Sequence, residues 1–469
     1  MDSKQYVGQV VVLAAGKGTR MRSNLPKVLH RVCGLTLLER VLRAALMLHP
    51  SRVVVVTGFG AELVQRELDE LRERGLFGAA NLEVVQQLEQ RGTGHAVMSA
   101  LPALDGAGNV MVLPGDCPLI KGEELRDFAV AAQSARLSFV TCEPDDATGY
   151  GRVVRGPDGA VQAIVEQKDC TPEQLRIGEI NAAIYLAELG FLKESVGQLT
   201  TANAQGEYYL TDIISYGVKK GLKIGTSKLA DPDAALGANS RAELSGLEAK
   251  RRAAINWALM ESGVTMEDPA TTYIDEDVTI GSESYIGAGT KLKGLTKVGA
   301  GAQIDGNCLI LDSTIGERVH VKLSCVIADS ELGNGVEVGP FAHLRPGTKL
   351  GDEVRIGNFV ETKKAVLGQG AKANHLSYIG DANVGAKTNI GAGVITCNYD
   401  GVHKHQTNIG EGCFVGTNSS LVAPVAIGDG AFVGAGSTIT KDVPAGALGL
   451  GRAKQTNLEG WVERKRKDS

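Results

Sequence analysis

The chain has 469 residues, of which 43% are hydrophobic and 22% are charged, and its formal net charge at pH 7 is -5. This length and apolar content predict roughly two to four domains with buried cores, and the mild negative charge gives no reason to expect nucleic acid or an anionic membrane as a partner. The eight cysteines are scattered without a Cys-x-x-Cys pair, Met1 to Gln5 lack the cationic region of a signal peptide, and no apolar run is long enough for membrane insertion. We therefore expect a cytoplasmic protein with reduced thiols.

The first predicted element is a buried strand over residues 7–15, which leads directly into a glycine-rich segment, Gly16 to Met21. Backbone N–H groups of such a loop can approach a phosphate closely, because glycine has no Cβ to hold the anion away. The segment does not match the Walker A pattern, which needs Gly-Lys-Ser/Thr, or the dinucleotide fingerprint, which needs a third glycine at Met21. Taken alone it is a weak signal, and a structural strand-to-helix turn explains it equally well.

Strands and helical segments then alternate, with a strand over 52–57, an amphipathic helix over 61–74 and a strand over 82–86. This alternation predicts an α/β domain with a Rossmann-like, mostly parallel sheet. A further apolar strand begins at Asn109 and leads to Asp116. Ligands of open α/β sheets gather at the carboxyl ends of strands, so Asp116 is a candidate Mg²⁺ ligand, although aspartate after glycine is also common in ordinary turns.

The next segments differ in period. Leu244, Leu247, Ile255 and Leu259 have the spacing of one long amphipathic linker helix. From about Thr272 to Val443, aliphatic residues recur at every sixth position, which is the period of a parallel β-helix whose coils stack about 4.8 Å apart. A disordered glycine-rich region would not keep this phase, and the period alone does not reveal the hand of the helix.

The six-residue period is interrupted by polar residues between Leu344 and Ile409, and residues 396–407 abandon it altogether. A spacer would repeat monotonously. The interruptions therefore predict a protruding loop and a functional site at one level of the coil.

Motifs in both halves resemble a known family. Leu13 to Met21 followed by Pro26-Lys27 resembles the signature of sugar-1-phosphate nucleotidyltransferases, and the polar breaks in the repeat resemble the acetyltransferase domain of bifunctional N-acetylglucosamine-1-phosphate uridyltransferases/glucosamine-1-phosphate acetyltransferases. The resemblance covers nearly the whole chain. It implies a uridylyltransferase domain over 1–241, a linker helix over 242–262, and a left-handed β-helix acetyltransferase domain with a C-terminal tail over 263–469.

The resemblance implies acetyl transfer from acetyl-CoA to glucosamine 1-phosphate, and then uridylyl transfer from UTP to N-acetylglucosamine 1-phosphate with release of pyrophosphate. The product is a precursor of the bacterial envelope. It also implies Mg²⁺ as cofactor and a homotrimer with acetyltransferase sites at the subunit interfaces. Two alternatives are a single-activity sugar-nucleotide pyrophosphorylase with a structural β-helix and a non-catalytic regulatory subunit. The residues that would distinguish them are all present: Arg345, Lys363, His375 and the 396–407 loop against the first, and Lys27, Asp116 and Asn239 against the second.

In the uridylyltransferase half, the resemblance assigns Arg20 and Lys27 to the charge on the transferring group, and Asp116 and Asn239 to the metal. A loop containing Gln87 and Gln90 would read the uracil. The full set of predicted binding positions is Leu13, Ala14, Ala15, Gly16, Lys27, Gln87, Gln90, Gly92, Thr93, Gly115, Asp116, Gly151, Glu166, Asn181 and Asn239, of which Gly151, Glu166 and Asn181 would contact the amino sugar. Two departures concern the fine shape of this pocket: Ala182-Ala183 stand where the family usually has Thr-Gly, and Ser240 replaces a common second asparagine.

In the acetyltransferase half, His375 fits the general base because an imidazole titrates near neutral pH, and Arg345 and Lys363 fit a phosphate clamp. A structural histidine and a solvated face of the coil are the plain alternatives. We expect Glu361 to orient His375. The resemblance assigns Tyr378 and Asn389 to the sugar, and Ala392, Asn398, Tyr399, Thr417, Ala435 and Arg452 to acetyl-CoA. The basic end of the tail, Arg464 to Lys467, is interpreted as a solvated terminus.

Overall fold

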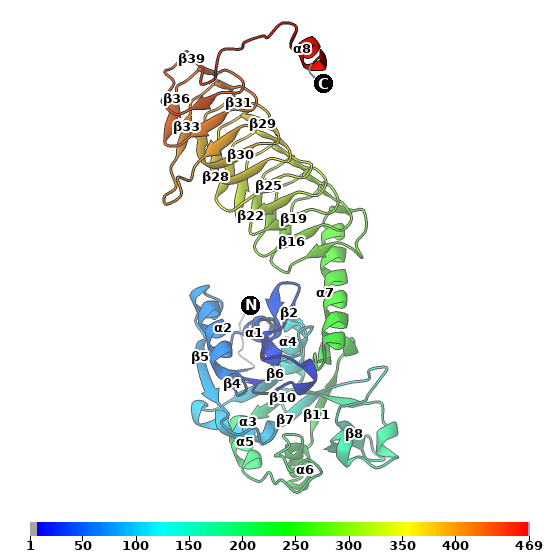
Figure 1. Ribbon diagram of the computed structural model, residues 1–469. Helices are drawn as coiled ribbons and strands as arrows, with labels where there is room; N and C mark the ends of the chain where they lie inside the picture. Colours follow the sequence, from blue (N-terminus) through cyan, green and yellow to red (C-terminus); the bar gives the residue numbers. More distant parts are fainter. Residues whose placement is uncertain (1–6, 468–469) are drawn as a thin grey trace. The chain divides into compact units, whose positions relative to one another are not determined.

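The computed structural model describes residues 7–467 and divides into two compact units, residues 1–251 and 252–469, which are shown in Figure 1. Met1 to Gln5, which the sequence analysis considered as a possible signal region, lie outside the described residues. Within residues 7–467, none of the helices combines the length and apolarity that a bilayer crossing requires. None of the eight cysteines, all of which lie within the described residues, forms a disulfide bond.

Unit 1 is built on a nine-stranded mixed sheet in which the strands run in the order β11-β7-β10-β6-β1-β4-β5, with the β8–β9 hairpin attached through β10. Strands β1, β4, β5 and β6 are parallel, and β10 runs antiparallel to β6 and β7. The predicted mostly parallel α/β sheet is therefore confirmed. The strands are β1 Gln9–Ala14, β4 Arg52–Thr57, β5 Asn81–Gln86, β6 Asn109–Pro114, β7 Leu137–Cys142, β8 Arg152–Arg155, β9 Val161–Val165, β10 Ile180–Glu188 and β11 Gly225–Lys228.

Helices cover both faces of this sheet, which explains why β1 reads as a continuous apolar run. Val10 and Val12 enter one core, which is formed with α1, α2 and α4, and Val11 enters a second core, which is formed with α3, α5 and α6. The helices are α1 Leu37–Leu46, α2 Ala61–Glu73, α3 Thr93–Ala100, α4 Gly122–Ala131, α5 Leu189–Val196 and α6 Asp212–Lys219.

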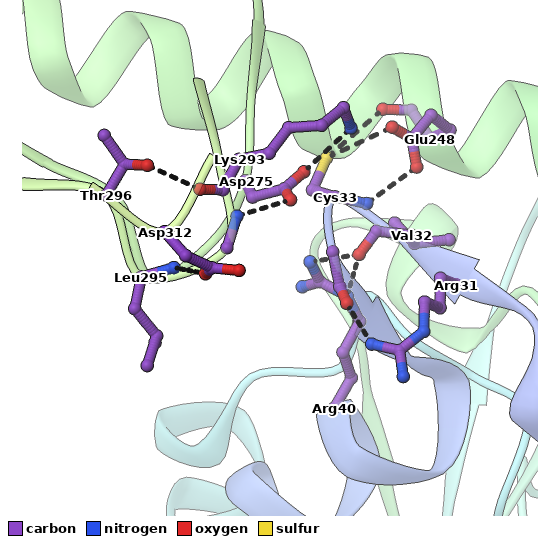
Figure 2. Close-up of polar contacts among 12 residues, drawn as sticks. Arg31, Val32, Cys33, Arg40, Glu248, Asp275, Lys293, Leu295, Thr296 and Asp312 are labelled. Carbon is purple, nitrogen blue, oxygen red and sulfur yellow. Dashed lines mark hydrogen bonds and ion pairs between the residues drawn. The ribbon is translucent and has the colours of Figure 1, made fainter. Parts of the chain in front are cut away.

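A long helix, α7 (Arg241–Glu261), occupies the predicted linker segment to within one residue at each end. Near its start, the β2–β3 hairpin (Arg31–Val32 and Leu35–Thr36) is fastened to the helix, because the Cys33 N–H donates to Glu248 Oε2 at 2.7 Å (Figure 2). Near its end, Ile255 and Leu259 pack on the apolar core of the coil. The final turns of α7 thus cover apolar side chains that the first coil would otherwise expose.

Unit 2 is a parallel β-helix. Its strands form two long ladders, and each strand pairs in parallel with the strand one coil away, as in the series Leu292, Ile310, Ile327 and Leu344. These four aliphatic residues are fully buried, so the six-residue period predicted the buried positions correctly. Carboxylates satisfy backbone groups at the corners, as where the Leu295 N–H donates to Asp312 Oδ1 at 2.9 Å (Figure 2).

The strands of the first ladder are β12 Thr265–Met266, β15 Tyr285–Ile286, β18 Gln303–Ile304, β21 His320–Val321, β24 Glu337–Val338, β27 Arg355–Asn358, β29 Lys372–His375, β31 Asn389–Ile390, β34 Phe414–Val415, β37 Phe432–Val433 and β39 Leu448–Gly449. Those of the second ladder are β13 Tyr273–Ile274, β14 Thr279–Ile280, β16 Lys291–Lys293, β17 Lys297–Val298, β19 Leu309–Leu311, β20 Thr314–Ile315, β22 Val326–Ala328, β23 Ser330–Leu332, β25 His343–Leu344, β26 Thr348–Leu350, β28 Glu361–Leu367, β30 Tyr378–Val384, β32 Ile395–Cys397, β33 Thr407–Ile409, β35 Ser420–Val422, β36 Val425–Ile427 and β38 Thr438–Ile439. An exposed tail follows, with a short helix, α8 (Trp461–Lys467).

Candidate active sites

Unit 1 contains a cavity of about 510 Å³ at the carboxyl ends of β1 and β6. The glycine-rich segment after β1 forms one wall, as its predicted role in cradling phosphate requires. The predicted residues that line the cavity are Leu13, Ala15, Gly16, Lys27, Gln87, Gln90, Gly92, Thr93, Asp116, Glu166 and Asn181.

Two residues of the cavity wall, Lys27 and Asp116, meet a third residue, Asn239, that does not itself line the cavity. The ammonium group of Lys27 forms an ion pair with Asp116 and donates to Asn239 Oδ1 at 2.6 Å. The Lys27 side chain is only 12% exposed, so its charge is held by these two partners. Although no cluster of three or more His, Cys, Asp and Glu side chains suited to a metal occurs among the described residues, Mg²⁺ needs only one or two protein oxygens. The carboxylate of Asp116 and the amide oxygen of Asn239 fit that requirement.

Ser240 has a structural role beside this cluster. Its hydroxyl accepts from the Glu243 N–H at 3.2 Å, as a helix cap does at the start of α7, and Glu243 Oε2 accepts from the Asn239 N–H at 3.0 Å. The serine that departs from the family pattern thus helps to fix the backbone of Asn239.

The predicted uracil loop is held in place by its own side chains. Gln87 is buried, and its Nε2 donates to the Gly92 carbonyl at 3.1 Å and lies 3.0 Å from His95 Nδ1. Backbone bonds link the loop to Tyr208, because the Gly94 N–H donates to Tyr208 O at 2.8 Å. The NH₂ group of Gln87 therefore orders the loop, whereas the exposed Gln90 keeps its amide available to a ligand.

The opposite side of the cavity is formed by Glu166 and Asn181. Glu166 accepts from the Thr211 hydroxyl at 3.1 Å, and burial raises the pKa of its carboxyl group. Asn181 Nδ2 donates to the Tyr185 hydroxyl at 2.6 Å, and its Oδ1 accepts from the Ala183 N–H at 3.0 Å. Thr211, Tyr185 and Glu207 also line the cavity, and the sequence analysis did not identify them.

Several predicted residues of this half do not line the cavity. Arg20 is exposed in the short turn Thr19–Met21, so the structure does not bring it to the cavity wall as expected. Ala14 is buried in the sheet. Two glycines support the wall from behind: the Gly115 N–H donates to Leu13 O at 2.9 Å, and Gly151 O accepts from the Asn181 N–H at 2.9 Å.

In unit 2, His375 lies at the end of β29, one coil beyond Asn358. Its Nδ1 is 3.3 Å from Asn358 Oδ1. A carbonyl oxygen can only accept, so the contact is a hydrogen bond in the tautomer that carries its hydrogen on Nδ1, and in that tautomer the lone pair of Nε2 is free to take a proton. The expectation that Glu361 orients His375 is wrong, because the Glu361 carboxylate instead accepts from Arg345 Nη1 at 2.8 Å.

The other predicted residues of unit 2 fall into two groups. Successive coils place Asn389, Phe414 and Phe432 in register, so that Ala392, Thr417 and Ala435, three residues further along, follow His375 along one edge of the coil. Lys363, in β28, pairs with Gly380 of β30, two residues after Tyr378, and its Nζ is 3.8 Å from Asp381 Oδ2. Arg452 is exposed in the segment after β39.

The 396–407 segment forms the protruding loop that the sequence predicts, and internal bonds order it. Asn398 is buried, whereas the hydroxyl of the exposed Tyr399 donates to Gly401 O at 2.5 Å. Two backbone N–H groups, from His403 and Val402, and the ring of His405 lower the pKa of Asp400 to about 2. The loop also carries Lys404, which the sequence analysis missed; the neighbouring Lys363 ammonium lowers the pKa of Lys404.

Comparison with known proteins agrees with this arrangement. Residues 10–173 match the model of the MobA-like NTP transferase domain, and residues 329–364 and 406–441 match that of the bacterial transferase hexapeptide (six repeats). The bifunctional protein GlmU of Pelobacter propionicus is 46% identical over 97% of this chain and 98% of its own length, and that of Trichlorobacter lovleyi is 45% identical over 98% and 99%.

The chain belongs to the family of bifunctional GlmU proteins.

Its relatives in this family also include the bifunctional protein GlmU of Streptococcus suis, at 46% identity over 97% of both chains. Among solved structures, UDP-glucose pyrophosphorylase complexed with UDP-glucose has a TM-score of 0.45 and 15% identity, over 52% of this chain and 98% of the other. As a member of the GlmU family, the chain is a transferase with two activities, uridylyl transfer and acetyl transfer, and the predicted fold class and function are confirmed.

Proposed function

We propose that the cavity of unit 1 performs the uridylyl transfer, with N-acetylglucosamine 1-phosphate attacking the α-phosphorus of UTP and pyrophosphate leaving. The observation that carries this proposal is that Lys27 and Asp116, in the cavity wall, converge with the adjoining Asn239. Asp116 and Asn239 would hold Mg²⁺, which when bound supplies positive charge against the phosphates. Lys27 neutralises the transferring group, and no covalent nucleophile is needed.

Two other parts of the cavity wall bind the uracil base and the amino sugar. Gln90 and the backbone around Gly92 and Thr93 bind the uracil, and the buried Gln87 holds that loop in shape. Glu166 and Asn181 bind the amino sugar. The proposed boundaries of this function are residues 1–241, with 242–262 as linker and 263–469 as the acetyltransferase.

We propose further that unit 2 acetylates glucosamine 1-phosphate. His375 Nε2 takes a proton from the amine as it attacks the thioester, and the contact with Asn358 supports this tautomer. Arg345 and Lys363 bind the phosphate, and Tyr378 and Asn389 bind the sugar. Acetyl-CoA extends along the edge formed by Ala392, Thr417 and Ala435, a position supported by their alignment with His375, and it also contacts Asn398, Tyr399 and Arg452.

The proposed homotrimer is supported by an apolar ridge on one corner of the coil. The ridge consists of Leu323, Phe341, Phe359 and Leu376, which are 43%, 48%, 55% and 63% exposed, and the two phenylalanine rings stack with centroids 5.6 Å apart. Three of these bulky residues have positive φ angles, between 48° and 57°, a backbone conformation that is costly for large side chains. A second copy of the chain covering the ridge, next to His375, would account for this exposed apolar surface. The predicted left hand of the coil and the cytoplasmic location are part of the same proposal.

Two variants test the division of labour. The purified protein is assayed for CoA release with glucosamine 1-phosphate and acetyl-CoA, and separately for pyrophosphate release with N-acetylglucosamine 1-phosphate and UTP. Asp116→Ala should abolish Mg²⁺-dependent pyrophosphate release and leave CoA release intact, and His375→Ala should do the reverse. If either variant kept the activity that it is expected to lose, the corresponding assignment would be wrong.

A further inference from the structure

Asp381 lies between residues that the proposed function assigns to different substrates. It is in β30, and its Oδ2 accepts from Asn398 Nδ2 at 2.5 Å and is 3.8 Å from Lys363 Nζ. The side chains of Lys363 and Asp381 are only 14% and 18% exposed, so this carboxylate is largely shielded from water. A shielded charge that contacts both a cation and an amide holds both more firmly than an exposed one would.

The contact with Asn398 fixes the base of the protruding loop. Asn398 is buried, and its carbonyl accepts from the His405 N–H at 2.8 Å, so the loop is anchored there on both of its arms. Because Asn398 Nδ2 donates to Asp381, that hydrogen bond fixes the orientation of the whole side-chain amide, including its oxygen. Loss of the carboxylate would free the amide and the start of the loop together.

The contact with Lys363 concerns the phosphate side. Lys404, from the protruding loop, approaches Lys363 closely; the Lys363 ammonium lowers the pKa of Lys404, and the Asp381 carboxylate, 3.8 Å from Lys363 Nζ, partly offsets that effect. Tyr378 is the other titratable group that faces this pair. Two neighbouring ammonium groups repel each other, and a shared carboxylate offsets that repulsion.

We propose that Asp381 is a positioning residue that ties the sugar-phosphate and acetyl-CoA parts of the acetyltransferase site together, by holding Lys363 on one side and Asn398 with its loop on the other. This inference rests on the proposed function of unit 2. A purely structural alternative exists, because aspartate tolerates the positive φ of 46° that the chain adopts at this corner. Asp329 provides a matched control: it has a φ of 43° at the same corner three coils earlier, and it is exposed.

The first test is a double-mutant cycle on acetyl-CoA binding, measured by calorimetry on the full chain. Asp381→Ala and Asn398→Ala should each lower the affinity for acetyl-CoA about 10-fold. The double variant should have the same affinity as the single variant that binds more weakly, because both substitutions remove the same contact. Asp381→Asn keeps an acceptor for Asn398 and should bind acetyl-CoA within about 3-fold of the wild type. Asp329→Ala should bind like the wild type. Independent, multiplicative losses in the double variant, or wild-type affinity in Asp381→Ala, would overturn the proposal.

The second test separates positioning from simple stability. Glucose 1-phosphate is used as the probe because it has no amine that titrates at alkaline pH. The Asp381 carboxylate favours the charged form of Lys404, which lies beside Lys363, so in Asp381→Asn the affinity for glucose 1-phosphate should fall at a lower pH than in the wild type and in Asp329→Asn. An unchanged alkaline limb would contradict the role of Asp381. Neither test depends on turnover. If the wild-type protein bound acetyl-CoA and glucose 1-phosphate but did not acetylate glucosamine 1-phosphate, the proposed function would be refuted. The double-mutant cycle would still decide whether Asp381 positions Asn398.

Discussion

The contact between Asn358 and His375 allows a quantitative prediction about the proposed general base. Removing a base of this kind costs about 10²- to 10⁴-fold in rate, whereas removing a residue that only orients it costs one hydrogen bond. The 3.3 Å separation between Asn358 Oδ1 and His375 Nδ1 is at the long end of the range, which places its value near 1 kcal/mol, or about 5-fold in rate. We therefore expect Asn358→Ala to lower kcat for acetyl transfer about 5-fold and His375→Ala to lower it at least about 100-fold.

The measurement is the release of CoA at saturating glucosamine 1-phosphate and acetyl-CoA, with pyrophosphate release from supplied N-acetylglucosamine 1-phosphate and UTP by the same preparation as an internal reference. Asn383→Ala is a suitable control, because Asn383 donates to Asn408 Oδ1 at 2.9 Å in another exposed rung of the coil. It should change neither rate. An Asn358→Ala enzyme with wild-type kcat, or one as inactive as His375→Ala, would refute the reasoning that Asn358 acts by holding the imidazole in one tautomer.

Three further changes have outcomes that follow from the geometry. A Cβ on Gly357 would overlap the backbone carbonyl of Asn374 in the next coil, so Gly357→Ala should destabilise unit 2 by about 2 kcal/mol in denaturant melts. It should also lower the rate of acetyl transfer and leave uridylyl transfer near the wild-type rate, and an equal loss of both rates would argue against a local effect. Because burial raises the pKa of Glu166 in the folded chain, its ionised form weakens folding as pH rises through that pKa; Glu166→Gln should therefore melt above the wild type at pH 8 and together with it at pH 4, and the reverse order would be inconsistent with the shift. Ala183 has a φ of 59°, which strains a residue with a Cβ, so Ala183→Gly should raise the melting temperature of unit 1. The rise should be only about 1–2 °C, because glycine also gains backbone entropy in the unfolded chain. A lower melting temperature would show that the packing of the methyl group outweighs the strain.

The apolar pattern predicted the architecture well because each period corresponds to one kind of burial. Val10 to Val12 are apolar without interruption since helices cover both faces of the sheet, and the six-residue spacing of Leu292 and Val298 follows from one inward side chain on each face of the coil. The same reasoning located Asp116, because the carboxyl end of a strand is where a parallel sheet presents polar groups. Its partners Lys27 and Asn239 came from the family resemblance, and no local pattern joins residues so far apart in the chain.

Other details could not be deduced from the sequence. Gln87 and Gln90 were both assigned to the uracil and both line the cavity, but only the fold shows that Gln87 is buried against Gly92 and His95. Arg20 was assigned by its motif alone; it is exposed in the turn Thr19–Met21, and its role at the transferring group stays a prediction. Glu361 was expected to orient His375. The register places Asn358 opposite the histidine instead, and the Glu361 carboxylate is held by Arg345.

In a coil of this kind, the chemical neighbours of a residue are one coil away, about 17 or 18 positions along the chain. The coil that contains the protruding loop is longer than its neighbours. His375 and Ala392 are 17 residues apart and Thr417 and Ala435 are 18 apart, but 25 residues separate Ala392 from Thr417. The additional residues leave the ladder between β31 and β34 unbroken, so they are accommodated in the loop that carries Asn398 and Lys404. The ladder fixes its own side chains by pairing, whereas the loop lies outside the ladder and is held by its own contacts. The contacts at the base of the loop, above all that of Asn398 with Asp381, therefore determine whether Lys404 remains beside Lys363.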